Sequence, residues 1–379
     1  MQKKTISNLS KLAVPFRSKG RFFKEIETSL RNDFQRDRDR IIHSTAFRRL
    51  KHKTQVFVNT SGDHFRTRIT HSLEVSQIAR TLSKFFNLNE DLSETLSLAH
   101  DLGHTPFGHA GEESLNNCMT NYGGFDHNIQ TLRIITLLEN RYYNFKGLNL
   151  SFETLDGLIK HNGPINNLKK FNKILGNNFF KKKIKFTLNS SLEAQFASIS
   201  DDIAYNSHDL EDGLKSNLFK LKDLKNIPIL DKIIIKHIKK TNKYSIDLII
   251  RQIIREIINE MVSDVISTTR NNININKIKN LNDIYKTKFQ LVTFSDKMKK
   301  FDAKIKKFLK QKMYFHKKVN LKTKYGGRVI TKLFTSIKQN PKKYIDIKKY
   351  NNSNLARIIC DYIAGMTDRY AINLYNQIK

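Results

Sequence analysis

Apolar residues recur at helical spacing along most of this chain of 379 residues, and the pattern predicts a mostly α-helical fold. Between residues 69 and 86 the apolar stripe includes Leu73 and Ile78, and residues 191–214 show the same periodicity. His71 falls on the stripe of the first helix, so we expect its imidazole to point toward the interior.

A second stripe within residues 191–214 is polar. Asp201, Tyr205 and His208 recur at i, i+4 and i+7, so they share one helix face. We expect this face to be available to a ligand.

Helix-start and helix-stop residues place a helix end at a His-Asp pair. Asn89, followed by two acidic residues, is typical of a helix N-terminus, and the helix that it opens runs to His100-Asp101. Gly103 and Pro106 then end this helix. Because successive residues of a regular helix point about 100° apart, the pair can face one ion only where the helix ends.

The remaining pattern is also helical. Short strands are predicted only for residues 55–59 and 143–152, and no Gly-rich phosphate loop occurs. The lysine-rich helical pattern beyond Gly213 is interrupted around residues 326–327 and at Pro341. Further helices are predicted over residues 33–50, from His109 through Ser114, and as one amphipathic helix over residues 355–378.

The formal net charge of +33 predicts attraction to polyanions such as nucleic acid, nucleoside triphosphates or an anionic membrane surface. Much of the excess lies in lysine-rich stretches such as residues 179–185 and 297–312. These stretches are equally well explained as solvated helix faces, so both interpretations stay open.

Cysteine usage and hydropathy indicate the compartment. Only Cys118 and Cys360 occur, which excludes a disulfide framework and a cysteine-based zinc site. No signal peptide and no uncharged apolar run of about 18 residues is present, so we expect no association with a membrane. The sequence therefore predicts a cytoplasmic protein.

His71, His100, Asp101 and Asp201 can supply a two-histidine, two-aspartate metal site. This ligand set suits Mn, Mg, Fe, Co, Ni or Zn, and the sequence does not distinguish among these divalent ions. A single inward histidine is more often a hydrogen-bonded core residue than a ligand. Of the 12 histidines, however, all except the last two lie between His43 and His208, which favours a common site. A bound ion can lower the pKa of water and neutralise a phosphoryl oxygen, the usual route to phosphate ester hydrolysis.

Candidates for proton transfer surround this set. His109 and Glu112, three residues apart, can hydrogen-bond on one helical face, and a carboxylate-oriented imidazole is a sound general acid for a leaving alkoxide. Glu112 alone is also explained as a first-turn acid that stabilises the helix dipole. His104 and His127 are further candidates for proton transfer or phosphate contact.

Three arginines are candidates for phosphate binding. Arg49, Arg66 and Arg68 can bind a polyphosphate in bidentate fashion, whereas the alternative is ordinary surface pairing with nearby aspartates. Arg68 is the strongest candidate because it lies one turn before His71.

Longer motifs contain these residues in a fixed order. They include Arg68-Ile-Thr-His-Ser-Leu-Glu-Val75, Ala99-His-Asp-Leu-Gly-His-Thr-Pro-Phe-Gly-His-Ala-Gly-Glu112, Phe125-Asp-His-Asn128, Lys160-His-Asn-Gly-Pro164, Asp201-Asp-Ile-Ala-Tyr-Asn-Ser-His-Asp209 and Asp361-Tyr-Ile-Ala-Gly-Met-Thr-Asp-Arg-Tyr370. The ordered set covers residues 30–215 densely and then the C-terminal segment. It resembles the HD-domain deoxynucleoside triphosphate triphosphohydrolases, in particular the bacterial dGTPase-like proteins.

The resemblance implies a mostly α-helical HD fold with few short strands and a divalent metal held by His71, His100, Asp101 and Asp201. It implies that a dNTP such as dGTP is hydrolysed between the 5′ oxygen and the α-phosphorus, which releases deoxynucleoside and inorganic triphosphate. It also implies that His109 with Glu112 delivers the proton, while His104 and His127 contact phosphate or water. The residues expected to contact the substrate are Arg68, Gln55, Val56, Arg49, Asp202, Tyr205 and Asp209.

The resemblance further implies a homo-oligomer with a second nucleotide as activator, and the basic charge leaves single-stranded DNA as a candidate modulator. The predicted organisation is an N-terminal arm (residues 1–30), an HD catalytic core (31–215), a lysine-rich helical insertion or extension (216–325) and C-terminal helices that pack on the core (326–379).

Two alternatives to dNTP hydrolysis use the same residues. An HD-type phosphodiesterase or nuclease would keep the metal site and act on a cyclic nucleotide or single-stranded nucleic acid. A nucleic-acid-binding protein would keep the ion only as a structural element and derive its affinity from the charge, with a steep dependence on salt.

Overall fold

The computed structural model describes residues 9–25, 30–55, 66–175, 184–225, 227–346 and 354–378. Within these ranges helices are joined by loops, and the β-type pairing is confined to an isolated antiparallel bridge between Thr54 and Thr67. The prediction of a mostly helical fold is confirmed. No helix in the described ranges is both long and apolar enough to cross a membrane.

The predicted strand at residues 143–152 is wrong. Residues 143–151 form bends and loop, because Gly147 and Asn149 adopt left-handed backbone conformations that a strand does not allow. The Leu148 and Asn149 carbonyls accept hydrogen bonds from the Arg40 side chain at 2.8 and 3.0 Å instead of from a neighbouring strand. Of the other predicted strand, residues 56–59 lie outside the described residues.

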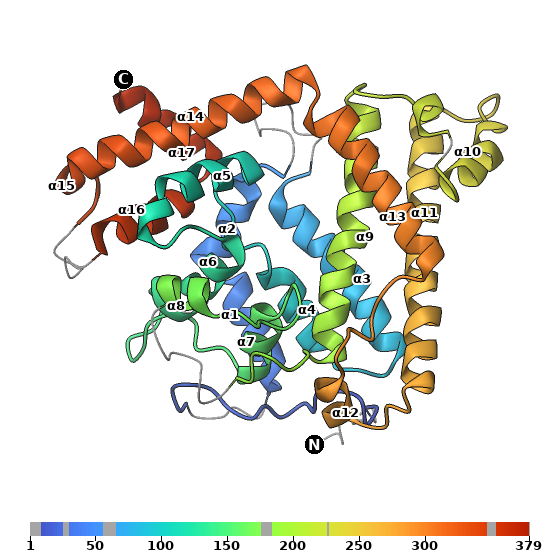
Figure 1. The fold of residues 1–379 in the computed structure, drawn as a ribbon, viewed down its shortest axis with the longest axis horizontal. Coiled ribbons are helices and arrows are strands. Elements are labelled where there is room, and N and C mark those ends of the chain that lie inside the picture. The colour runs from blue at the N-terminus through green and yellow to red at the C-terminus, as the bar shows by residue number, and fades with distance from the viewer. Residues whose placement is uncertain are drawn as a thin grey trace.

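Three helices that pack against one another form the centre of the molecule (Figure 1): α3 (Arg68–Phe85), α4 (Glu90–Ala99) and α9 (Leu192–Lys215). The predicted helix start is confirmed, because the Asn89 side chain accepts the Leu92 N–H at the start of α4. His71 is buried on α3 as predicted, together with Val75 and Ile78. Leu73 is about half exposed, since it points away from this buried face two positions before Val75.

The remaining helices of the N-terminal half cover this centre on one side. The predicted helix over residues 33–50 is divided at Ser44, whose side chain accepts the Phe47 N–H and starts a new helix. The elements are α1 (Asp33–Ile42), α2 (Thr45–Arg49), the 3₁₀ turn η1 (Leu50–His52), α5 (Gly108–Cys118), the 3₁₀ turn η2 (Thr120–Tyr122), α6 (His127–Arg133), the π-helical turn η3 (Ile134–Leu138), α7 (Phe152–Ile159) and α8 (Lys169–Leu175).

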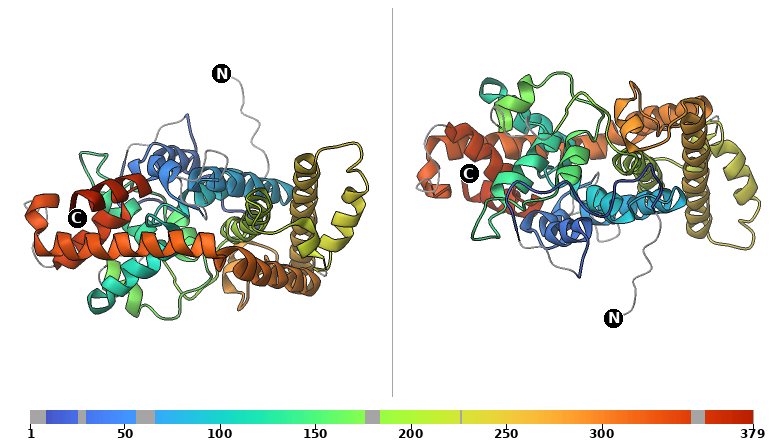
Figure 2. Two further views of the ribbon diagram at one scale, coloured as in Figure 1. Left: turned by 90° about the horizontal axis from the view of Figure 1, so that it is seen from above. Right: turned by 90° about the horizontal axis from the view of Figure 1, so that it is seen from below.

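The lysine-rich region packs along the other side of α9. Its longest helix, α11 (Ile246–Ile275), contacts α9 and α10 (Leu230–Ile238), and the α10–α11 pair forms one edge of the molecule (Figures 1 and 2). The elements are the 3₁₀ turn η4 (Leu221–Leu224), α10 (Leu230–Ile238), α11 (Ile246–Ile275), α12 (Leu281–Lys286), α13 (Asp296–Leu309) and the π-helical turn η5 (Lys310–Tyr314).

The C-terminal helices pack on α5. Helix α14 (Lys317–Gln339) contacts α5, α16 (Leu355–Ala364) and α17 (Asp368–Ile378), and the short α15 (Pro341–Tyr344) follows α14, so the predicted interruption at Pro341 is confirmed. The segment predicted as one C-terminal helix is therefore two helices, divided at residues 365–367.

The interruption predicted at residues 326–327 is wrong, because both glycines lie inside α14. A Cβ atom at Gly326 would come within 2.6 Å of the Phe107 side chain, so this glycine allows α14 to approach the start of α5 closely. The predicted boundary between residues 325 and 326 thus falls within a continuous helix.

Candidate metal centre and substrate cavity

The four predicted metal ligands converge from the three central helices. On α3 and α9, His71 Nε2 lies 2.9 Å from Asp201 Oδ1, and His100 Nε2 at the end of α4 lies 3.7 Å from the same oxygen. The ligand atoms of these three residues all lie within 4.8 Å of one another. Asp101 Oδ1 lies 3.4 Å from His100 Nε2, so the adjacent pair faces one point as expected at a helix end.

The surroundings of His100 prepare its Nε2 atom to bind a metal. Its Nδ1 atom lies 2.6 Å from the Ser97 carbonyl oxygen, which fixes the proton on Nδ1 and leaves the lone pair on Nε2. This buried Nε2 makes no hydrogen bond within the described residues. Burial lowers the pKa of His100, which keeps the imidazole neutral.

Both carboxylates are held in the ionised form. Burial raises the pKa of Asp201, but His100, His161 and His71 together hold it well below the usual range. Burial likewise opposes ionisation of Asp101, whose pKa is held well below the usual range chiefly by Arg68. Two ionised carboxylates beside the Nε2 lone pair of His100 form a donor set that suits a divalent cation.

Arg68, the predicted phosphate-binding arginine, lies beside this centre. Its Nη1 atom lies 2.8 Å from Asp101 Oδ2, while its buried Nε has no hydrogen-bond partner in the described part of the chain. Arg68 is therefore placed next to the candidate metal centre with a free Nε–H donor.

Sequence reasoning assigned no role to two histidines that touch the centre. His161 Nε2 lies 3.5 Å from Asp201 Oδ2, and its ring stacks on that of His100. His208 Nδ1 lies 3.5 Å from His71 Nδ1. Two features of the sequence pointed to these histidines: the polar stripe that His208 shares with Asp201, and the motif that contains His161. Neither feature specified a contact with the metal centre.

A second cluster contains His104, Glu112 and His127. His127 Nδ1 lies 2.8 Å from Glu112 Oε1, and the rings of His104 and His127 stack with centroids 3.9 Å apart. Although burial opposes both shifts, the contact lowers the pKa of Glu112 to about 2 and raises the pKa of His127. His104 Nε2 lies 3.1 Å from Asp101 Oδ1, so this cluster adjoins the metal ligands.

The predicted hydrogen bond between His109 and Glu112 is not formed. His109 Nδ1 lies 4.0 Å from Glu112 Oε2, and the His109 side chain is 70% exposed. The Glu112 carboxylate is satisfied by the N–H and Nδ1 of His127, which starts α6. His109 instead lines a cavity.

This cavity, of about 540 Å³, is lined by residues of α5, α9, α13, η5 and α14 and by the Thr54–Gln55 segment, and the four candidate metal ligands are not among its lining residues. It contains the predicted substrate residues Gln55 and Tyr205, and the buried Gln55 Oε1 has no hydrogen-bond partner within the described residues. Tyr205 follows Asp201 by one turn of α9, which joins the cavity to the metal ligands. Other lining residues include Thr54, Phe107, His109, Lys306, Tyr314 and Phe315.

Tyr314 and Lys306 reach this cavity from the lysine-rich region, and sequence reasoning missed both. The Tyr314 hydroxyl donates to the carboxylate of Asp209, and burial raises the pKa of Asp209 to about 7. Lys306 Nζ lies 2.7 Å from Asp202 Oδ1. Asp202 is not among the lining residues of the cavity, but it contacts Lys306, which is. No local signal distinguishes Lys306 from its neighbouring lysines.

One predicted substrate residue lies elsewhere, and another falls outside the described residues. The Arg49 guanidinium donates to the Gly365 carbonyl at 2.9 Å and lines a different cavity of about 320 Å³ beside Tyr362 and Tyr370. Val56 lies outside the described residues.

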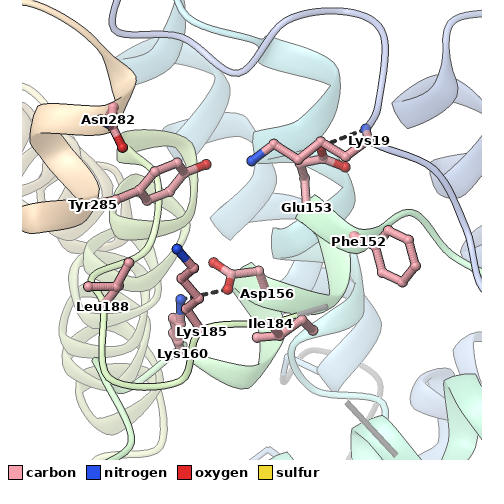
Figure 3. Close-up of a pocket in the computed structure, with 10 residues that line it drawn as sticks. All are labelled: Lys19, Phe152, Glu153, Asp156, Lys160, Ile184, Lys185, Leu188, Asn282 and Tyr285. Carbon is pink, nitrogen blue, oxygen red and sulfur yellow. Dashed lines mark hydrogen bonds and ion pairs between the residues drawn. The ribbon is translucent and has the colours of Figure 1, made fainter. Parts of the chain in front are cut away.

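A further cavity of about 210 Å³ lies between α7 and α12 and contains none of the predicted site residues (Figure 3). In it, Lys160 Nζ pairs with Asp156 at 2.5 Å and Lys19 lies over the Tyr285 ring. Lys160 directly precedes His161.

Comparison with known proteins agrees with this geometry. The HD domain family matches residues 68–206, and the family described as phosphohydrolase-associated domain matches residues 292–377. A protein of Pelagibacter ubique is 57% identical over 373 residues, covering 97% of this chain and 99% of its own length. A protein of Bartonella quintana is 46% identical over 382 residues (97% and 94%), and one of Rickettsia rickettsii is 44% identical over 371 residues (96% of each). All three bear the name deoxyguanosinetriphosphate triphosphohydrolase-like protein.

The chain belongs to this family. It is an HD-domain hydrolase, as the sequence motifs predicted. The HD match includes all four predicted metal ligands, and the phosphohydrolase-associated match includes α13, α14, α16 and most of α17, and with them Lys306 and Tyr314.

Proposed function

We propose that this hydrolase cleaves deoxynucleoside triphosphates, dGTP among them, to deoxynucleoside and inorganic triphosphate. The proposal depends mainly on one observation. Asp201 of the candidate metal centre and Tyr205, which lines the cavity of about 540 Å³, lie one turn apart on α9. Small-molecule sites typically measure roughly 300–1,000 Å³. The names of the relatives support the same substrate class.

The residues present fit a divalent cation. His71, His100, Asp101 and Asp201 would hold it, because the buried His100 Nε2 lacks a hydrogen bond within the described residues and both carboxylates stay ionised. When bound, such an ion increases the acidity of water and neutralises charge on a phosphoryl oxygen. The donor set does not select among Mn, Mg, Fe, Co, Ni and Zn.

The side chains around the centre supply the remaining chemistry. Arg68 would bind the phosphates, since its guanidinium lies beside the ligands with a free Nε. His109 faces the cavity and would protonate the departing 5′ oxygen. The Glu112–His127 ion pair would hold a proton next to His104 and would fix the position of the His127 ring that stacks on His104.

The sugar would lie against Tyr205 and the Asp209–Tyr314 pair. The buried Asp209 carboxylate accepts a hydrogen bond from the Tyr314 hydroxyl. A sugar hydroxyl that displaced Tyr314 would therefore have to donate an equivalent hydrogen bond to Asp209. Gln55, with its unpaired Oε1, would contact the sugar or base from the opposite wall.

The test is a hydrolysis panel of the four dNTPs on metal-reconstituted protein, with identification of the products. We expect deoxynucleoside and triphosphate in equal amounts, and no products from the Asp201→Asn variant. Nucleoside monophosphate with pyrophosphate, or no turnover of any dNTP, would overturn the proposal. Repeating the panel with mixed dNTPs and with single-stranded DNA tests activation, and the mass of the native protein tests the proposed homo-oligomer.

A further inference from the structure

One buried carboxylate joins the C-terminal helices to two segments of the active site. Asp368, the first residue of α17, is buried and accepts the Phe107 N–H on Oδ1 at 3.1 Å. Its Oδ2 accepts the Thr54 N–H at 3.1 Å and also the Thr54 hydroxyl. A carboxylate with three donors from two separate segments fixes those segments relative to each other.

A buried lysine makes a parallel connection one residue away. The Lys53 ammonium donates to the carbonyls of His104 and Ala364, the latter at the C-terminal end of α16. Burial, together with nearby Arg68, lowers the pKa of Lys53 to about 7. Because a buried amine costs free energy unless it is hydrogen-bonded, the two carbonyls hold Lys53 in this position.

The connected loop has an unfavourable backbone. Phe107 and Gly108 adopt φ angles of +62° and +58°, in the left-handed region that a bulky side chain rarely occupies. Helix α5 starts at Gly108, the second residue of this turn, and no side chain caps it. The direction of α5, which carries His109 and Glu112, therefore depends on what holds Phe107 in place.

We propose that Asp368 and Lys53 are positioning residues that set the 104–108 loop and the start of α5 against the Thr54–Gln55 wall of the substrate cavity. This inference rests on the proposed function, in which His109 delivers a proton to the 5′ oxygen as the bond from that oxygen to the α-phosphorus breaks. Neither residue touches the metal ligands directly. The phosphohydrolase-associated segment thus takes part in catalysis through the backbone of the HD segment.

Asp368→Asn replaces one of the two accepting oxygens by a donor, and Lys53→Met removes both donated hydrogen bonds, so the two variants test this inference with little change in side-chain size. We expect each variant to lower kcat for dGTP by about 30-fold, because small misplacements of reacting groups cost up to about 10²-fold. KM for dGTP and metal content should change by less than about 3-fold. The isosteric Thr54→Val should also lower kcat, whereas Thr54→Ser, which keeps the hydroxyl, should retain the kcat of the wild-type protein.

Asp264→Asn is the matched control for stability. Asp264 also accepts one backbone N–H and one hydroxyl, from Ser295 at 2.8 and 2.6 Å, but it lies on α11. The inference would be overturned if the loss of kcat in Asp368→Asn were fully accounted for by loss of metal or of folded protein, in the same proportion as in Asp264→Asn. Retention of kcat within about 3-fold in both Asp368→Asn and Lys53→Met would also overturn it.

Hydrogen exchange separates this inference from the proposed function. Exchange of the amides of residues 104–110 should accelerate at least about tenfold in Asp368→Asn and stay unchanged in Asp264→Asn. Unchanged exchange in Asp368→Asn would overturn the positioning role even if dGTP is the substrate. Failure of the wild-type protein to hydrolyse any dNTP would overturn the proposed function instead.

Discussion

Helix α9 of the HD core and helix α13 of the lysine-rich region bury different kinds of side chain. Helix α9 of the core buries His208, Asp209 and Asp212 together with its apolar residues. Helix α13 of the lysine-rich region buries only apolar side chains, and most of its lysines are exposed. Because a buried ionisable group costs free energy unless it is paired, the buried charges mark the part of the molecule that carries chemistry.

The same two helices show where some of the charge of +33 lies. Most lysines of α13 lie on the exposed face of an amphipathic helix. Lys306 differs from them, since it pairs with Asp202 and lines the substrate cavity. Lys306 is therefore distinguished from the other lysines of α13 by its position at the cavity.

The largest effect is expected for His100→Ala. Loss of a buried metal ligand should abolish stoichiometric metal binding and lower kcat/KM by at least about 10³-fold, since ion-mediated charge stabilisation amounts to several kcal/mol. Elemental analysis and dGTP turnover measure both. The matched control from the other region is His237→Ala, because His237 also pairs with a carboxylate, Glu256, at 2.7 Å. Equal loss of metal in both variants would contradict the account.

The next largest effect is expected for Glu112→Gln. Glu112 raises the pKa of His127 against burial, so the variant should lower this pKa, as measured by NMR titration, and reduce kcat by about 10²-fold. Because the pKa of Glu112 is lowered, its contribution to stability is complete above its usual pKa of about 4.5 and is lost as the pH falls toward 2. Because the pKa of His127 is raised, its contribution is complete below its usual pKa of about 6.5 and is lost at higher pH. The variant should therefore be most destabilised near pH 5.5, and equal destabilisation at about pH 9 would exclude the ion pair as the cause.

A smaller effect is expected where the two regions meet. Tyr314→Phe removes the hydroxyl that donates to buried Asp209, so the pKa of Asp209 should rise further above about 7 and KM for dGTP should increase by about tenfold. Tyr285→Phe is the control, because Tyr285 lines the cavity between α7 and α12. An unchanged KM in Tyr314→Phe would remove this residue from the substrate site.

The smallest effect is expected on the exposed face of α13. The combined change of Lys297, Lys300 and Lys304 to Gln should alter kcat/KM by less than about 2-fold and the free energy of unfolding by no more than about 0.5 kcal/mol per site. A large loss of salt-sensitive binding to single-stranded DNA in this variant would show that the face binds nucleic acid.

The helix positions of the candidate metal ligands His71, His100 and Asp101 were predictable because their signals are local. The helix end at His100-Asp101 follows from Asn89, Gly103 and Pro106, and the inward direction of His71 follows from helical spacing. Helix type and most helix starts were predictable for the same reason.

What was missed depends on contacts between distant segments. Tyr314 reaches Asp209 across the space between η5 and α9, and nothing in the local sequence of either residue indicates this. The glycines of α14 suggested a break, whereas Gly326 is needed for the approach of α14 to Phe107. The His109–Glu112 spacing allowed a hydrogen bond, but the start of α6 supplies Glu112 with a closer partner, His127.

The most direct test of the central claim is hydrolysis of dGTP in ¹⁸O-labelled water by the metal-reconstituted protein, followed by mass spectrometry of both products. Attack of water on the α-phosphorus with departure of the 5′ oxygen predicts one ¹⁸O atom in triphosphate and none in deoxyguanosine. Labelled deoxyguanosine, or formation of dGMP and pyrophosphate, would contradict the proposed reaction.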